Sequence, residues 1–198
     1  MPRGEARARL LEAARSLVRH RGFAATSVDE LCAAAGVTKG AFFHHFPSKE
    51  ALGVALIDDW TATTGVLFAS HPYNSLPDPL ERVFGYLDLR REILGQPIPE
   101  FSCVAGTTVQ EAYETSISIR MAAERSLRSG FDHVRAHLAA ALAAHPVAGV
   151  TAESLARQFQ IAVQGGIVLA KALDDPAPAR EAFDHLEALI VDEDVACD

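Results

Sequence analysis

One stretch, residues 27–50, constrains this chain more than any other, because it specifies two short helices joined by a tight turn. Ser27, followed three residues later by Glu30, predicts a helix start at which the two residues cap each other's backbone N–H groups. Gly36 can adopt the left-handed conformation that ends such a helix, and Thr38 is a suitable N-cap for a second helix. This pattern predicts a helix-turn-helix, whose second helix enters the major groove of DNA.

The second helix is expected to span Lys39–Phe46, with Pro47 and Ser48 separating it from the next helix. Its first turn is the part that reaches base edges and phosphates, while the helix N-terminus before Val28 is a natural phosphate site. The predicted DNA-binding residues are Thr26, Ser27, Thr38, Lys39, Gly40, Ala41, Phe43, His44 and Lys49. The alternative is that the two lysines are solvated surface charges.

The sequence GFAATSVDELCAAAGVTKGAFFHHFPSKEAL resembles the DNA-binding domain of the TetR/AcrR family of transcriptional repressors nearly position for position. The resemblance implies a dimer that binds a palindromic operator in double-stranded DNA, and it points to the same DNA-contacting positions. One residue departs from the family pattern, since Phe43 stands where the family usually has Tyr. A phosphate hydrogen bond from that hydroxyl is therefore absent, although the ring can still pack against sugar and thymine methyl groups.

The net charge of −8 disfavours a DNA-binding protein until its distribution is considered. Residues 1–52 contain eight basic and five acidic residues, a net charge of +3, whereas residues 53–198 contain 10 and 21, a net charge of −11. The positive end can face phosphate while the acidic remainder faces solvent. Without an apolar run of about 20 residues or a secretory signal, a cytoplasmic protein with no membrane partner is predicted.

Helical periodicity with no strand alternation predicts an all-α fold of about nine helices. We expect a three-helix domain over 1–50 that binds DNA and a helical domain over 51–198 that binds a ligand and dimerises. A first helix over 5–21 is expected before the helix-turn-helix. After it, the expected helices span 48–68, 79–94, 103–113, 117–144, 151–173 and 179–191. Residues 96–102 are expected to form a loop.

The second domain is expected to bind a small organic ligand or an electrophile, as the resemblance implies. Large apolar and amphipathic side chains are expected inside it and could line an apolar pocket. These candidate ligand-binding residues are Trp60, Phe68, Phe84, Phe101, Cys103, Tyr113, Met121 and Phe131. The alternative for each of them is that it simply fills the core.

Three cysteines lie far apart and form no metal-binding or disulfide pattern. Cys103 is expected at a helix N-terminus, where the helix dipole can promote the reactive thiolate. The segment FSCVAGTTVQE resembles a TetR subgroup, typified by the N-ethylmaleimide repressor, in which a cysteine here senses oxidants or electrophiles. The alternative is an inert buried thiol. Cys32 is expected in the core and Cys197 on a frayed tail.

The spacing of His133 and His137 could place two imidazoles on one metal ion, but two histidines without a third ligand are weak evidence. A solvated helix face is the favoured interpretation, and neither a metal nor a cofactor is expected. No nucleophile elbow, phosphate loop or paired-carboxylate pattern stands out. The chain is therefore not expected to be an enzyme, and a helical enzyme remains the remote alternative.

The last two helices are expected to provide the dimer surface. Gly165 and Gly166 inside a helical pattern suggest the close approach of another backbone. Two copies of an apolar stripe could form a four-helix bundle about a twofold axis. The predicted interface residues are Phe159, Val163, Gly166, Ile167, Phe183, Leu186 and Ile190. The alternative for this stripe is an intramolecular core. For the function of the whole protein, the alternative is an activator or a ligand-independent regulator.

Overall fold

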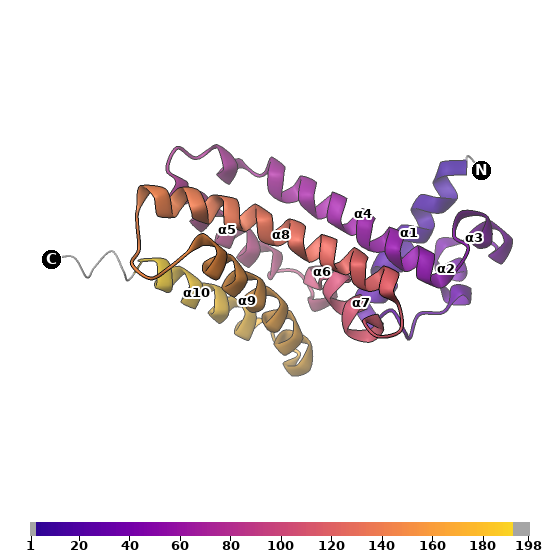
Figure 1. Cartoon of the computed structure of the whole chain (residues 1–198). Coiled ribbons are helices and arrows are strands. Elements are labelled where there is room, and N and C mark those ends of the chain that lie inside the picture. Colours follow the sequence, from indigo (N-terminus) through magenta and orange to yellow (C-terminus); the bar gives the residue numbers. More distant parts are fainter. Residues whose placement is uncertain (1–2, 192–198) are drawn as a thin grey trace. The chain divides into compact units, whose positions relative to one another are not determined.

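The computed structural model describes residues 3–191, and within them it contains ten α-helices, one 3₁₀-helix and no strand (Figure 1). The all-α prediction is confirmed. The helices are α1 (Arg3–Arg21), α2 (Val28–Ala35), α3 (Lys39–His45), α4 (Lys49–Ser70), η1 (Pro72–Ser75), α5 (Pro79–Ile93), α6 (Ile98–Phe101), α7 (Val104–Ala112), α8 (Ile117–Ala144), α9 (Ala152–Leu173) and α10 (Ala177–Val191). The predicted tail position of Cys197 lies outside the described residues.

The extra helix relative to the predicted nine is α6, a single turn inside the segment predicted to be a loop. It starts after Pro97, whose carbonyl accepts from Glu100 N at 2.7 Å, and Pro99 lies in its first turn, where the ring is tolerated. Four residues are too few to display helical periodicity, so the sequence pattern does not reveal this turn.

The chain forms two compact units, and both α4 and α8 contribute to each of them. Within the described residues, the first unit joins residues 3–64 with residues 102–127, and the second joins residues 65–101 with residues 128–191. The predicted boundary after residue 50 divides the chain by function and stays a prediction.

The first unit has one hydrophobic core that is shared by all of its helices. Leu10, Leu31, Phe42 and Leu56 are completely buried, and α7 and the start of α8 add Val104, Ala105, Ile119 and Ala122 to the same cluster. A domain of about 50 residues is near the lower limit for an independent core. The three N-terminal helices therefore depend on residues 102–127 for their packing.

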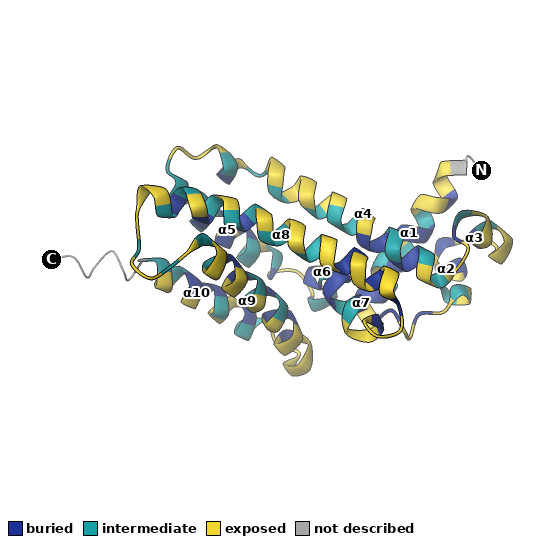
Figure 2. Cartoon of the chain, viewed as in Figure 1, coloured by how far each residue is buried: buried dark blue, intermediate teal, exposed yellow. Residues whose placement is uncertain are grey.

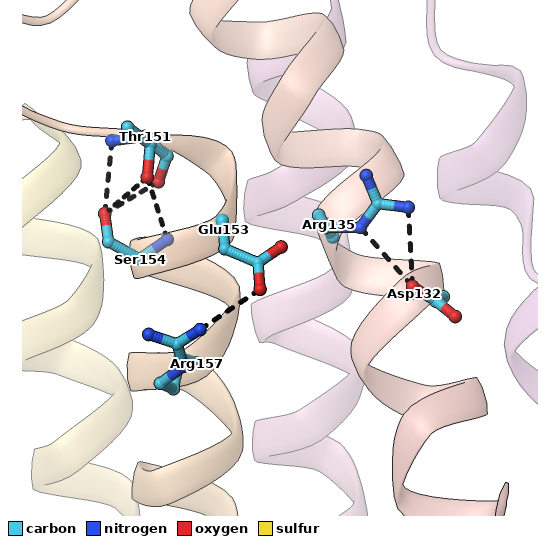
Figure 3. Close-up of polar contacts among 6 residues, drawn as sticks. All are labelled: Asp132, Arg135, Thr151, Glu153, Ser154 and Arg157. Atoms are coloured by element: carbon cyan, nitrogen blue, oxygen red, sulfur yellow. Dashed lines mark hydrogen bonds and ion pairs between the residues drawn. The ribbon is translucent and has the colours of Figure 1, made fainter.

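The second unit contains η1, α5, α6, α9 and α10 together with the later parts of α4 and α8. Within it, α9 and α10 lie side by side (Figure 1). The start of α9 matches the prediction because Thr151 and Ser154 cap it reciprocally, with Ser154 N donating to Thr151 Oγ1 at 3.0 Å and Thr151 N to Ser154 Oγ at 3.1 Å (Figure 3). Glu153 and Arg157 form an ion pair at 3.1 Å one turn apart.

In the described part of the chain, α4 is the one helix that is long and apolar enough to cross a membrane, judged by length and composition alone. Core helices of globular proteins can meet the same criterion. Leu52, Leu56 and Ile57 of α4 are completely buried in the first unit, and Asp59 pairs with Arg15 of α1 at 2.6 Å. These contacts are those of a core helix, and the expectation of no membrane partner stays a prediction.

Candidate nucleic-acid interface

The first helix of the motif, α2, starts with the predicted capping box. Ser27 Oγ accepts from Glu30 N at 3.2 Å, and Ser27 N donates to Glu30 Oε2 at 2.8 Å. The Ser27 hydroxyl also donates to Glu30 Oε2 at 2.7 Å. The hydrogen bonds that the carboxylate accepts from the Ser27 backbone N–H and then from the Ser27 hydroxyl lower the pKa of Glu30. Gly36 ends the helix with φ 61°, and its N–H donates to Ala33 O at 3.2 Å. The predicted start and end of α2 are both confirmed.

The second helix, α3, begins at the predicted N-cap, since Thr38 Oγ1 accepts from Ala41 N at 3.2 Å. It ends one residue earlier than predicted because Phe46 is extended, with φ −134°. Phe42 is completely buried and contacts Phe46, with ring centroids 5.9 Å apart. These two phenylalanines are core residues, as predicted, and they fix α3 to the rest of the first unit.

The opposite side of α3 is exposed (Figure 2). Lys39, Gly40, Phe43 and His44 are all open to solvent, and 54% of Phe43 is exposed although it is a large apolar side chain. The Phe43 ring contacts Phe42 edge to face, with ring centroids 5.2 Å apart, and its exposed part can contact sugars and thymine methyl groups in DNA. The predicted DNA-binding side of α3 is therefore open to solvent.

Lys39 forms an ion pair with Asp29 of α2, with Nζ 2.6 Å from Oδ1, and this hydrogen bond raises the pKa of Lys39. Both side chains are mostly exposed. Exposed pairs of this kind contribute little to stability and exchange readily with other partners. The Lys39 charge therefore remains available to a DNA phosphate or a base edge.

Two predicted phosphate contacts have partners within the protein. The Thr26 side chain is buried and its hydroxyl donates to Gly22 O at 2.8 Å, so this hydroxyl does not face outward, and the predicted phosphate contact of Thr26 at the helix N-terminus stays a prediction. The hydroxyl is instead used to close the loop after α1. Lys49 donates to Ala24 O at 3.1 Å, and its amine lies 4.6 Å from the centre of the Phe23 ring. Burial lowers the pKa of Lys49.

Cys103 is the N-cap of α7, as predicted, and its Sγ accepts from Gly106 N at 3.3 Å. It is half-buried and packs against the core of the first unit. Cys32 is buried in that core, as predicted, and its burial raises the pKa of its thiol. Among the described residues, no group of three or more His, Cys, Asp or Glu side chains could hold a metal ion.

The predicted ligand-binding residues do not gather at one place. Trp60, half-buried below the Arg19 guanidinium at 5.3 Å, belongs to the first unit, whereas Phe68, Phe84, Phe101 and Phe131 belong to the second. Tyr113 and Met121 are 54% and 52% exposed, so their predicted interior position is wrong. Tyr113 lies in the turn before α8, and Met121 lies on the outer side of the first turns of α8. The size of these side chains did not indicate whether they face the core or the solvent.

His133 and His137 do not form a solvated helix face, contrary to the sequence interpretation. Both are half-buried in the second unit, with ring centroids 4.9 Å apart. His133 Nε2 is hydrogen-bonded to the Tyr73 hydroxyl at 2.7 Å. Burial lowers the pKa of both histidines. The cause of the difference is η1, which brings the buried Tyr73 onto α8 from 60 residues away.

This aromatic cluster also holds Phe68 of the predicted ligand-binding set. Phe68 stacks near Tyr86 with ring centroids 5.5 Å apart, and the Arg90 guanidinium lies 4.3 Å from the Phe68 centroid. Arg90 Nε donates to the Tyr86 hydroxyl at 2.9 Å. Sequence reasoning missed Tyr73, Tyr86 and Arg90, because tyrosine and arginine at helical spacing are as typical of a surface as of a polar cluster.

The predicted dimer residues are mostly intramolecular. Phe159, Val163 and Ile167 of α9 and Phe183 and Leu186 of α10 are buried within one chain, so the prediction that they form the dimer surface is wrong. Ile190 is half-buried. Their burial favours the alternative, an intramolecular core: α9 packs along α10, and the Phe159 ring centroid lies 6.2 Å from that of Tyr86 on α5.

A different side of α9 is apolar and exposed. Ile161, Val168, Leu169 and Leu173 are between 46% and 61% exposed, and we call these four residues the outer stripe. On α10, Leu189 is 58% exposed. The signal for the outer stripe was present in the sequence, since its residues repeat at helical spacing, but the longer apolar series on the other side of α9 concealed it.

Two family models match this chain. Residues 10–56 match the model described as bacterial regulatory proteins, tetR family, and residues 79–185 match the C-terminal domain of LmrA/YxaF-like transcriptional regulators. The chain belongs to the tetR family. The membership agrees with the capped α2–turn–α3 motif and its exposed side, and the tetR-family resemblance of the sequence is confirmed.

Relatives within the tetR family are regulators. The chain is 31% identical over 140 residues to the transcriptional repressor Rv3405c of Mycobacterium tuberculosis, covering 66% of this chain and 74% of the relative. It is 36% identical over 69 residues to the A-factor receptor protein of Streptomyces griseus, of which the match spans only 25%. It is 43% identical over 54 residues to the repressor NemR of Escherichia coli, 27% of each chain.

Solved structures share the tetR-family fold along nearly the whole chain. A regulator from Agrobacterium tumefaciens aligns with a TM-score of 0.84 at 23% identity, covering 94% of this chain and 97% of that one. The reduced form of Escherichia coli NemR aligns with a TM-score of 0.78 at 24% identity, covering 91% and 95%. At these identities the likeness shows the fold alone.

Proposed function

We propose that this tetR-family protein is a homodimeric, cytoplasmic transcriptional repressor that binds a palindromic operator and is released by a small molecule or by thiol modification. The observation that supports this most directly is the exposed side of α3, where Lys39, Phe43 and His44 project from a helix anchored by the buried Phe42. Such a helix fits the major groove, and two copies read half-sites about 34–36 Å apart.

The outer stripe on α9, with Leu189 of α10, is our proposed dimer surface. Four large apolar residues at helical spacing form an exposed patch that monomeric proteins rarely keep. A second copy would bury the patch in an isologous contact, which gives the twofold symmetry that a palindromic operator requires. This placement replaces the buried side of α9 that the sequence suggested.

The protein could be released from its operator in two ways. Cys103 is half-buried at the N-terminus of α7, in the same unit as the helix-turn-helix, so its modification could alter DNA binding. A non-covalent aromatic ligand could instead bind in the second unit near Phe68, where Arg90, Tyr86 and His133 offer ring stacking and hydrogen bonds. Thiol modification is tested first, because it depends on a single atom, the Sγ of Cys103.

The test uses the full-length protein and labelled DNA from upstream of its own gene. Fluorescence anisotropy should show sequence-specific binding that weakens as salt increases. N-ethylmaleimide should release the wild type but not Cys103→Ser, and Cys32→Ser serves as the matched control because Cys32 is buried. If N-ethylmaleimide leaves operator binding by the wild type unchanged, release by thiol modification is excluded and release by a non-covalent ligand remains.

An activator or a ligand-independent regulator is the alternative within the same family. A footprint overlapping the promoter, with lower transcription in vitro when the protein is added, supports repression. A footprint upstream of the promoter with increased transcription would support activation and contradict the proposal.

A further inference from the structure

The main chain of Ala24, in the loop between α1 and α2, is held on both sides by charged side chains. Its N–H donates to Glu111 Oε2 of α7 at 2.6 Å, and its carbonyl accepts from Lys49 Nζ of α4 at 3.1 Å. We call this arrangement of Ala24, Lys49 and Glu111 the Ala24 clasp. Since the loop leads directly into α2, the clasp fixes the entry to the helix-turn-helix.

Gly22 is shaped to admit the Glu111 carboxylate. Its φ of 93° lies in the left-handed region that favours glycine. A Cβ added at Gly22 would clash with Glu111 Oε1, so any larger residue at this position would displace that carboxylate. The absence of a side chain at Gly22 therefore leaves room for the Glu111 carboxylate beside the loop between α1 and α2.

A second carboxylate, Glu50, connects the other end of the helix-turn-helix to residues 102–127. In this case the carboxylate lies next to the motif and its partners lie in residues 102–127. Glu50, in the first turn of α4, accepts hydrogen bonds from the hydroxyls of Ser116 and Ser118 at the start of α8. The bond from Ser116 is the main cause that lowers the pKa of Glu50. Together, Glu111 and Glu50 attach residues 102–127 to the helices that flank the motif at its beginning and its end.

Through Glu111, the clasp connects α7 directly to the loop before α2. Because α7 is a continuous helix from Val104 to Ala112, a displacement at its N-terminus carries Glu111 with it. We propose that Glu111 is a positioning residue for DNA binding, which transmits the position of α7 to the helix-turn-helix through the Ala24 N–H. This inference rests on the proposed operator binding and specifies how that binding is regulated.

The test compares Glu111→Ala and Glu111→Gln with Glu114→Ala, an exposed glutamate three residues away. Hydrogen exchange is measured on residues 22–27 and 104–112, with and without operator DNA. In Glu111→Ala, we expect the Ala24 amide to exchange about tenfold faster and operator affinity to fall about tenfold, the scale of one partly exposed charge-assisted hydrogen bond. Glu111→Gln keeps an acceptor oxygen and should recover part of both effects.

The decisive measurement is reciprocal. If α7 and the helix-turn-helix are coupled, operator binding must slow exchange in residues 104–112 of the wild type, and Glu111→Ala must lose that effect. A merely structural role for Glu111 would not change this DNA-dependent protection. If Glu111→Ala matches Glu114→Ala in affinity and protection while the wild type binds its operator, this role is refuted. If the wild type binds no operator, the proposed function fails as well.

Discussion

Gly166 on α9 lies so close to Ala179 on α10 that a Cβ added at Gly166 would stand 2.9 Å from Ala179 Cβ and 3.0 Å from Ala179 Cα. The adjacent Gly165 has nothing within 4 Å of such a Cβ. The close backbone approach that the two glycines suggested is therefore real, but it occurs within one chain and involves only one of them.

Alanine at these two neighbouring positions should have opposite effects on stability. In a Leu169→Glu background, where no second copy covers the outer stripe, Gly165→Ala should stabilise the protein by up to about 1 kcal/mol, the difference in helix propensity. Gly166→Ala should destabilise it by about 1–2 kcal/mol, because overpacking against Ala179 exceeds that gain. Urea unfolding at one protein concentration measures both changes. Effects of the same sign and size would contradict the packing described for α9 and α10.

Replacing Lys39 should weaken operator binding. Lys39→Ala is expected to lower affinity about tenfold and to reduce the slope of log K against log salt by about one, as for one lost phosphate contact. Anisotropy titrations at three salt concentrations provide both values. Arg157→Ala removes an exposed cation of similar kind from α9 and is the matched control. An unchanged slope for Lys39→Ala would place the DNA interface elsewhere.

A charge in the outer stripe should separate the proposed dimer. Leu169→Glu places a carboxylate in a contact that would otherwise be apolar, and burying an unpaired charge is costly. We expect a monomer by light scattering, with unchanged helical content by circular dichroism. Ile117→Glu, at another exposed apolar residue, in the first unit, is the control. A dimeric Leu169→Glu protein would exclude the outer stripe as the dimer surface.

The His133–His137 pair should make stability depend on pH. Burial lowers the pKa of both imidazoles in the folded protein, whereas the unfolded chain has pKa values of about 6.5. Below about pH 6.5 the unfolded state therefore binds protons that the folded state does not, and the free energy of unfolding falls as pH decreases toward the folded-state pKa values. Above this range the contribution is constant.

Urea unfolding between pH 7.5 and pH 5 tests this dependence. His137→Gln should reduce the loss of stability over this range, since it removes one of the two groups. His185→Gln, at an exposed residue of α10, should leave the loss as it is in the wild type. Equal pH profiles for all three proteins would show that protonation of His137 does not limit stability.

Local chemistry in the sequence was enough to predict most helix ends. The Ser27–Glu30 capping box, the left-handed Gly36 and the Thr151 N-cap each depend on residues within a few positions, and all are present. Cys103 was placed correctly at the start of α7 for the same reason. The helix-turn-helix and the family were predictable because the motif is contiguous in the chain.

The order of residues was therefore sufficient to locate most helices and to indicate the family. Which side of a helix is covered depends on its neighbours in the folded chain, because α9 is apolar on two sides and α10 can pack against just one of them. The contacts of His133 with Tyr73 and of Glu111 with Ala24 join residues 60 and 87 positions apart. Helical periodicity describes one helix at a time, so it contains no information about such partners.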